Sequence, residues 1–265
     1  MLTILLHTSK TMRDTSEGGS KASQVPLCIE QASYLADQLK KMSVQQLQQV
    51  MNISPSMAEK TADLIHSYDA NAKTLPAIDA FLGDIYSGLQ VQTFSAADRE
   101  YANHHLYILS GLYGVLRALD TIQPYRLEMG YKLPGHASMY AFWGDRIAKQ
   151  LPENQDIVNL SAVEYTKAVF PHFKHIEGLK DAKVITPKFL TYNHAKHEAI
   201  FVTVHAKIAR GAFARWMIQH RIEDTADLKS FNGLGYTYNK DLSTEDVPVF
   251  VAKKFEGLGL SVRLS

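Results

Sequence analysis

Residues 109–130 read LSGLYGVLRALDTIQPYRLEMG and combine two arginines, two acids and two tyrosines with four glycines or prolines. The residues just before them, 106–109, are mostly apolar and are predicted to end a buried strand. Gly111 and Gly114 then permit a backbone conformation or a close approach that a side chain would forbid. Pro124 fixes a turn ahead of the second group of charges. The strands and helices of the rest of the chain are predicted next.

The charged residues of this segment allow two interpretations. Arg117 with Asp120, or Arg126 with Glu128, can form an internal ion pair that ties down a long loop. Alternatively, the side chains are held in place for a functional site, because a plain core element carries few charged groups. The sequence of the segment is compatible with both.

Strands are predicted where apolar runs are bounded by polar residues. The polar residues 9–21 are predicted to form a loop after the first run. Glu164 and Tyr165 lie just beyond the end of a later one. The predicted strands are 2–6, 156–160, 184–190, 199–205 and 247–253, and 231–240 resembles a turn that enters a strand.

The segment 28–68 is predicted to form a helical hairpin element. Apolar residues recur at helical spacing over 28–41, Ser43 is typical of the N-cap of a second helix, and helical spacing resumes over 57–65. In a helix-hairpin-helix element, the hairpin amides and the next helix N-terminus can meet a DNA phosphate. Here the hairpin has serines where the general motif is rich in glycine, and only Lys60 supplies a nearby positive charge. Two packed helices joined by a tight turn explain the pattern equally well.

Three further helices complete the prediction. Ser95 and Asp98 resemble a capping box that opens a helix ending near His105. Helices are also predicted over 140–151 and 207–221. We therefore expect a single α/β domain over the whole chain, with a mixed sheet, helices on its faces and the helical hairpin inserted early.

Composition narrows the possible functions. The chain has 265 residues, of which 46% are hydrophobic, so it can bury a sizeable core. The formal net charge of +1 means that nucleic-acid binding requires local clustering of Lys and Arg. Cys28 is the only cysteine, which excludes an internal disulfide and a CxxC redox pair. The apolar opening residues 1–6 are predicted to be a strand and not a signal peptide, so we expect a cytoplasmic protein without membrane spans.

Metal and cofactor sites are not expected. His104 and His105 are adjacent, which is the wrong spacing for two ligands on one helix face. Glu198 lies near His194 and His197, but no HExxH or comparable spacing is present.

Short motifs along the chain resemble those of a known family. They are SKT at 9–11, FLGDIYSGL at 81–89, FWGD at 142–145, VNLSAVEY at 158–165 and KIARGAFAR at 207–215. Together with 109–130, they resemble the YaaA family of bacterial peroxide stress proteins over nearly the whole chain. The resemblance implies a cytoplasmic protein that protects DNA and proteins when hydrogen peroxide rises. It also implies DNA binding by an unusual α/β fold that carries a helix-hairpin-helix element.

The first functional hypothesis is therefore a DNA-binding protein of the peroxide response. On the predicted helix 207–221, Lys207, Arg210 and Arg221 fall within an arc of roughly 60°, a face suited to phosphate contact. An ordinary solvated face explains the same pattern. We expect a monomer that binds duplex or branched DNA without sequence preference. The candidate DNA-binding residues are Lys10, Lys60, Arg126, Lys207, Arg210 and Arg215.

The second hypothesis is an enzyme that acts on a nucleobase or nucleotide. The chain contains more carboxylates near these cations than a backbone binder needs, and an acid could transfer a proton. Asp84 and Tyr86 would share one face of a strand but diverge on a helix. The candidate catalytic residues are Asp84, Tyr86, Glu128, Glu164 and Tyr165, with Arg117, Asp120 and Arg126 as possible pocket residues. A third class, a partner-binding protein, has no exposed apolar stripe to support it.

Overall fold

A five-stranded sheet forms the centre of the molecule, with strand order β4-β3-β1-β6-β7. The computed structural model describes residues 1–14, 24–69 and 74–258. The strands are β1 (Leu2–His7), β3 (Leu106–Ser110), β4 (Gly114–Arg117), β6 (Asp156–Asn159) and β7 (Val184–Ile185). β1 pairs in parallel with β3 and β6, and only β4 runs antiparallel to its neighbour. Every residue of β1 and β3 is buried, as expected for strands covered on both faces.

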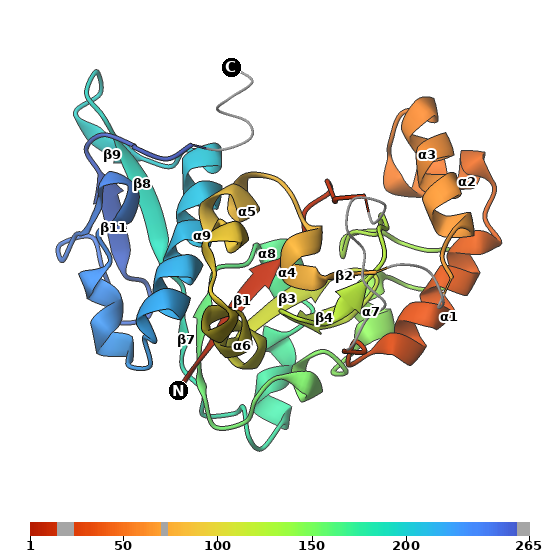
Figure 1. Ribbon diagram of the computed structural model, residues 1–265, viewed down its shortest axis with the longest axis horizontal. Coiled ribbons are helices and arrows are strands. Elements are labelled where there is room, and N and C mark those ends of the chain that lie inside the picture. The colour runs from red at the N-terminus through yellow and green to blue at the C-terminus, as the bar shows by residue number, and fades with distance from the viewer. Residues whose placement is uncertain (15–23, 70–73, 259–265) are drawn as a thin grey trace.

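A second sheet lies to one side of the first, with strand order β10-β11-β8-β9. Its strands are β8 (Lys188–Asn193), β9 (Glu198–Ile200), β10 (Tyr236–Tyr238) and β11 (Val249–Ala252). The long helix α9 (Thr203–His220) packs between this sheet and the short helix α5 (Asp84–Leu89), as Figure 1 shows. Helix α6 (Ala96–His105) packs against α9 and the central sheet. This mixed α/β arrangement, with helices flanking a mixed sheet, confirms the predicted fold class.

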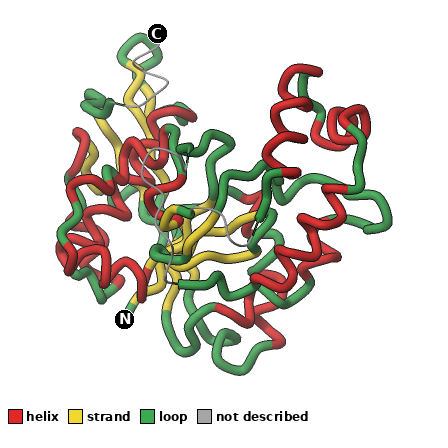
Figure 2. Tube along the Cα trace, turned by 45° about the vertical axis from the view of Figure 1, so that its right-hand side comes forward, coloured by secondary structure: helices red, strands yellow, loops and turns green. Residues whose placement is uncertain are grey.

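Three helices follow one another at the other end of the molecule (Figures 1 and 2). They are α1 (Ile29–Lys40), α2 (Val44–Met51) and α3 (Pro55–His66). Ser43 caps α2 in a capping box with Gln46, and Ser54 caps α3. Asn52 takes a left-handed conformation, φ 48°, which ends α2 and lets the chain turn into α3. The predicted three helical segments are confirmed.

Smaller elements connect these parts. They are β2 (Leu75–Pro76), β5 (Thr121–Ile122), α4 (Ala77–Ala80), α7 (Met139–Trp143), α8 (Val163–Thr166) and 3₁₀ segments at Val91–Thr93, Ala148–Gln150, Phe170–His175, Thr225–Ser230 and Gly233–Gly235. Of the predicted loop 9–21, residues 15–21 lie outside the described residues. Within the described ranges, no helix has both the length and the apolar character of a membrane span.

Two predicted elements are wrong in part because of a glycine or a proline. The helix predicted over 140–151 ends at Trp143, because Gly144 takes φ 51°, and only a 3₁₀ turn follows. The strand predicted over 184–190 is divided between the two sheets at Pro187, which has no N–H to donate to a ladder.

The strand predicted over 199–205 is also wrong in its second half. The residues Val202, Thr203 and Val204 have high strand propensity, yet α9 begins at Thr203. Packing of α9 against α5 and β8 outweighs this local preference. The predicted helix therefore begins four residues earlier than Lys207.

Candidate functional site

Four cations converge on one cavity of about 760 Å³, here called the basic cleft. Lys60 comes from α3, whereas Lys10 and Arg13 come from the loop after β1. Arg126 lies on the segment that follows β5. The side chains of Lys10, Arg13 and Lys60 are exposed, so their charges are available to a ligand. Among the described residues that line the basic cleft, Asp14 is the only acid.

Arg126 has one buried donor for which the described residues supply no partner. Its side chain is half-buried, and its Nε atom is buried without a hydrogen-bond partner among the described residues. A buried donor without a partner costs free energy. The ion pair considered between Arg126 and Glu128 is not formed in the described part of the chain.

A second cavity, of about 450 Å³, adjoins the basic cleft and shares Lys10 and Thr11 with it. We call it the strand-end pocket, because it lies where β1 and β6 end. Its walls are the loop after β1, the start of α5, the start of α8, α9 and the segment 109–130, here called the central segment. The lining residues are His7, Thr8, Ser9, Lys10, Thr11, Gly83, Asp84, Ile85, Glu128, Ala162, Glu164, Tyr165 and Lys207.

A hydrogen-bond chain fixes one acid of this pocket. The Tyr165 hydroxyl donates to Glu128 Oε2 at 3.0 Å and lies 3.1 Å from Thr8 Oγ1. A phenol has one hydrogen, so Thr8 donates to Tyr165 when Tyr165 donates to Glu128. Burial raises the pKa of Glu128, while the Tyr165 hydrogen bond and Lys10 oppose that increase. Glu128 is thus a half-buried carboxyl group held in a single orientation.

The His7 side chain is a neutral ring that lies beside these hydrogen bonds. The backbone N–H of Ala162 donates to His7 Nδ1 at 3.2 Å, which places the ring proton on Nε2. The ring stacks on Tyr165 with centroids 5.0 Å apart. Burial first, and then the nearby cations Arg210 and Lys207, lower the pKa of His7 to about 3. His7 therefore faces the pocket as a hydrogen-bond donor and not as a charge.

The structure brings most of the candidate acids together but separates one phenol. Asp84, Glu128, Glu164 and Tyr165 all line the strand-end pocket. Tyr86 does not, because residues 84–89 form a helix on which Asp84 and Tyr86 diverge. The Tyr86 hydroxyl is buried and donates to the backbone oxygen of His7 at 3.1 Å, a structural role.

The candidate cations on α9 are less alike than their spacing predicts. Lys207 is exposed and lines the strand-end pocket, whereas Arg210 is half-buried near His7. Arg215 donates to the side chain of Gln90. Arg221 ends α9 and forms an ion pair with Asp98 at 2.9 Å. Arg215 and Arg221 are therefore occupied by contacts within the protein, Arg210 is half-buried, and Lys207 is the exposed cation of this helix.

Arg117 and Asp120 form the internal ion pair that was one interpretation of the central segment. Arg117 Nη2 lies 2.8 Å from Asp120 Oδ1, and Asp120 is fully buried. Asp120 also accepts from the Arg117 backbone N–H at 2.8 Å and from Gln24 Nε2 at 2.9 Å. Neither residue lines the basic cleft or the strand-end pocket. Their role is to hold the turn after β4.

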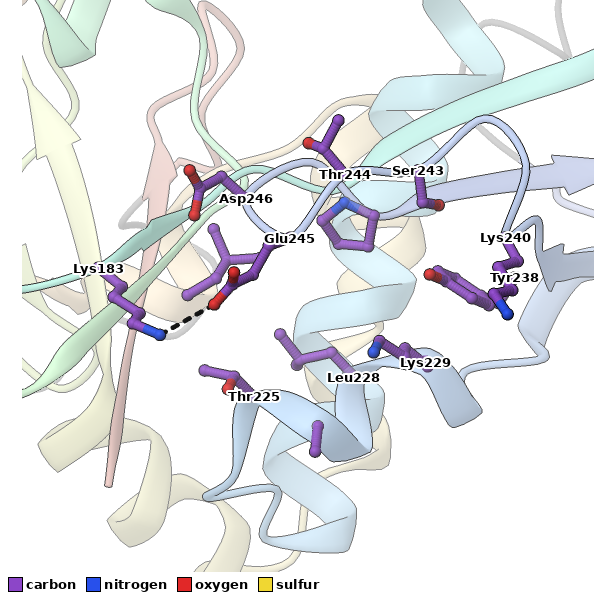
Figure 3. A pocket seen from close by; sticks show the side chains of 13 residues that line it. Lys183, Thr225, Leu228, Lys229, Tyr238, Lys240, Ser243, Thr244, Glu245 and Asp246 are labelled. Carbon is purple, nitrogen blue, oxygen red and sulfur yellow. Dashed lines mark hydrogen bonds and ion pairs between the residues drawn. The ribbon is translucent and has the colours of Figure 1, made fainter.

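A third depression lies beside the second sheet (Figure 3). It measures about 510 Å³ and is lined by residues between 183 and 248. Lys183 Nζ forms an ion pair with Glu245 Oε1 at 3.0 Å across one side of it. Lys229 lies over the ring of Tyr238, 5.9 Å from its centroid, and Lys240 is exposed. None of the sequence-predicted site residues lies here.

Three site residues are not predicted by the sequence patterns. His7 and Thr8 follow directly from the buried run of the first strand, and Arg13 lies within a polar loop. The available signal is their position next to the SKT motif, immediately after that strand. In the described residues, no group of three or more His, Cys, Asp or Glu side chains is arranged to hold a metal ion.

The geometry defines an α/β protein with a basic cleft and an adjoining polar pocket at the carboxyl ends of its parallel strands. Residues 2–242 match the family described as peroxide stress protein YaaA. The chain is also 48% identical over 263 residues to a UPF0246 protein of Salinispora tropica, covering 98% of this chain and 97% of that protein. The chain therefore belongs to the YaaA family of peroxide stress proteins.

Proposed function

We propose that the protein binds DNA through its phosphate backbone as part of the peroxide stress response. The observation that supports this proposal is the convergence of Lys10, Arg13, Lys60 and Arg126 on the basic cleft, where Asp14 is the only acid among the described lining residues. Contacts between Lys or Arg and phosphates supply affinity without reading the base sequence. A chain with a net charge of +1 needs such a local cluster to attract DNA.

In this proposal, α2, the turn at 52–54 and α3 serve as the helix-hairpin-helix element. Pro55 and Ser56 at the start of α3 are exposed, and Lys60 follows about one turn later. A helix N-terminus favours a nearby anion, and an exposed lysine adds a mobile positive charge. A phosphate at the start of α3 would therefore lie close to the basic cleft.

Lys207 extends the proposed surface, whereas Arg215 contributes little because its guanidinium already donates to Gln90. The acids of the strand-end pocket repel phosphates, so we propose that the DNA backbone runs over the basic cleft and does not enter that pocket. The protein is proposed to act as a monomer on duplex or branched DNA. The family is described by a stress response and not by a reaction, which does not favour an enzyme.

A salt titration of binding to duplex, branched and single-stranded DNA tests the proposal. The variant Lys10→Ala/Lys60→Ala should bind unrelated duplex sequences more weakly and to a similar extent. On duplex DNA, the slope of log K against log salt should fall by about 0.9 for each phosphate that the variant no longer neutralises.

Lys229→Ala/Lys240→Ala is the matched control, because it also removes two exposed lysines, here from the depression in Figure 3. Both double variants change the net charge by the same amount. The control should keep the wild-type slope. Equal losses in the two double variants would show that the effect is net charge alone, and an unchanged slope in Lys10→Ala/Lys60→Ala would reject the basic cleft.

A further inference from the structure

The strand-end pocket lies at the topological switch point of the central sheet. β1 has β3 on one side and β6 on the other, and all three are parallel. In sequence order, β3 and β4 come first and lie on one side of β1. The later strands β6 and β7 lie on its other side. In open α/β sheets, small ligands bind outside the carboxyl ends of the two strands where the strand order reverses in this way. His7 at the end of β1 and residues 8–11 after it line the pocket, together with Ala162, Glu164 and Tyr165 after β6.

One part of this pocket offers positive charge and donors. Lys10 and Lys207 are both exposed and line it from different elements. The neutral ring of His7 adds an Nε2–H, since its Nδ1 already accepts from Ala162. Two ammonium groups and a fixed N–H are suited to a carboxylate or a phosphate group.

The other part offers acceptors. Glu128 Oε2 accepts from Tyr165, and Glu164 Oε1 accepts from the Gly130 N–H at 2.9 Å. Each carboxylate therefore keeps further lone pairs for a ligand N–H. Holding the Glu128 carboxylate half-buried costs free energy. The hydrogen bonds from Thr8 to Tyr165 and from Tyr165 to Glu128 orient this carboxylate. Carboxylates in this position oppose the binding of a DNA phosphate, so the proposed DNA contact does not account for them.

We propose that the strand-end pocket binds a compact metabolite that carries one anionic group and at least one N–H donor. Lys10 and Lys207 bind the anionic group, and Glu128 and Glu164 accept the N–H groups. A volume of about 450 Å³ is within the range of small-molecule sites. Nucleoside monophosphates and α-amino acids share this chemistry. The inference does not depend on DNA binding.

Calorimetric titration of the whole protein tests this site. The probes are nucleoside 5′-monophosphates, α-amino acids and inorganic phosphate. We expect saturable one-to-one binding by a member of one of the first two sets, and at least tenfold weaker binding of inorganic phosphate. Glu128→Gln and Lys207→Met should each weaken binding of that probe at least tenfold, while Lys229→Met in the depression of Figure 3 should change it less than twofold.

Circular dichroism establishes that each variant is folded. If Glu128→Gln does not fold, Glu164→Gln replaces it, because Glu164 is exposed and lines the same pocket. Absence of saturable binding by every probe overturns the proposal, as does binding that the pocket variants leave unchanged. Binding of a metabolite by a protein that does not bind DNA would reject the proposed function and support this site.

Discussion

Gly88 of α5 and Gly211 of α9 face each other across the contact between the two helices, and neither position has room for a side chain. A Cβ atom at Gly88 would lie 1.9 Å from the carbonyl oxygen of Ile208, and one at Gly211 would lie 1.8 Å from that of Ile85. The two backbones are therefore in direct contact. This close approach brings Asp84 at the start of α5 and Lys207 near the start of α9 into one pocket.

Replacement of Gly211 by alanine should destabilise the protein by about 3 kcal/mol, because the packed helices must move apart. Helix propensity alone predicts the opposite sign, a gain of about 1 kcal/mol for Gly→Ala. Urea unfolding measures the difference. Gln219→Ala, at an exposed position of the same helix, should stay within about 0.5 kcal/mol of wild type. A Gly211→Ala protein as stable as wild type would mean that the helices are not in backbone contact.

The pair of Arg117 and Asp120 should contribute to stability and not to DNA binding. Asp120→Asn leaves the guanidinium beside a buried neutral group and should cost about 3 kcal/mol. Asp145→Asn disrupts the exposed pair with Lys149 and should cost far less than Asp120→Asn. Chemical denaturation compares the two variants, and DNA titration should give wild-type affinity for Asp120→Asn. A large loss of DNA affinity in a folded Asp120→Asn protein would place this pair in the functional site.

The sequence predicted those elements whose local signals agree with their packing. The buried run of β1 and the caps Ser43 and Ser95 specify elements without reference to the rest of the chain. Local signals predicted α9 as a helix over 207–221, but they do not specify its first turn or its packing. The helix is buried on two sides, and Gly211 looks unfavourable in a helix until its partner Gly88 is known.

Some residues of the candidate site were also predictable from local signals. Glu164 and Tyr165 are identifiable as residues just past a strand, and Lys10 as a residue just past another. Their proximity depends on the pairing of β1 with β6, two strands about 150 residues apart in the chain, which no local pattern specifies. The role of His7 as a donor depends on the backbone N–H of Ala162, which is distant in the sequence. This role can therefore be inferred only from the folded structure.

Cys28 should be dispensable for peroxide protection. The thiol is buried at the start of α1, and burial raises its pKa to about 11, so little thiolate forms near neutral pH. Cells that carry Cys28→Ala should survive a hydrogen peroxide challenge as well as cells with the wild-type protein at equal abundance. The native protein should also react with iodoacetamide far more slowly than the unfolded chain. Loss of protection by a folded, normally abundant Cys28→Ala protein would contradict this prediction.

His7 should make the protein less stable in acid. In the unfolded chain, a histidine binds a proton below about pH 6.5, whereas burial first, and then Arg210 and Lys207, lower the pKa of His7 to about 3 in the folded protein. Between these values the unfolded state binds more protons, so the free energy of unfolding falls by about 1.4 kcal/mol per pH unit as pH decreases. This contribution is fully present above pH 6.5 and is lost as pH falls towards 3.

His7→Asn tests this linkage, because the asparagine oxygen can still accept from the Ala162 N–H while the side chain does not titrate. The stability advantage of wild type over His7→Asn should be roughly 2 kcal/mol smaller at pH 5 than at pH 7. Urea unfolding at both pH values measures it. His104→Asn, at an exposed histidine, should give no such change. Parallel stability curves for wild type and His7→Asn would show that His7 is protonated equally in both states, and would remove the argument for a neutral donor in the strand-end pocket.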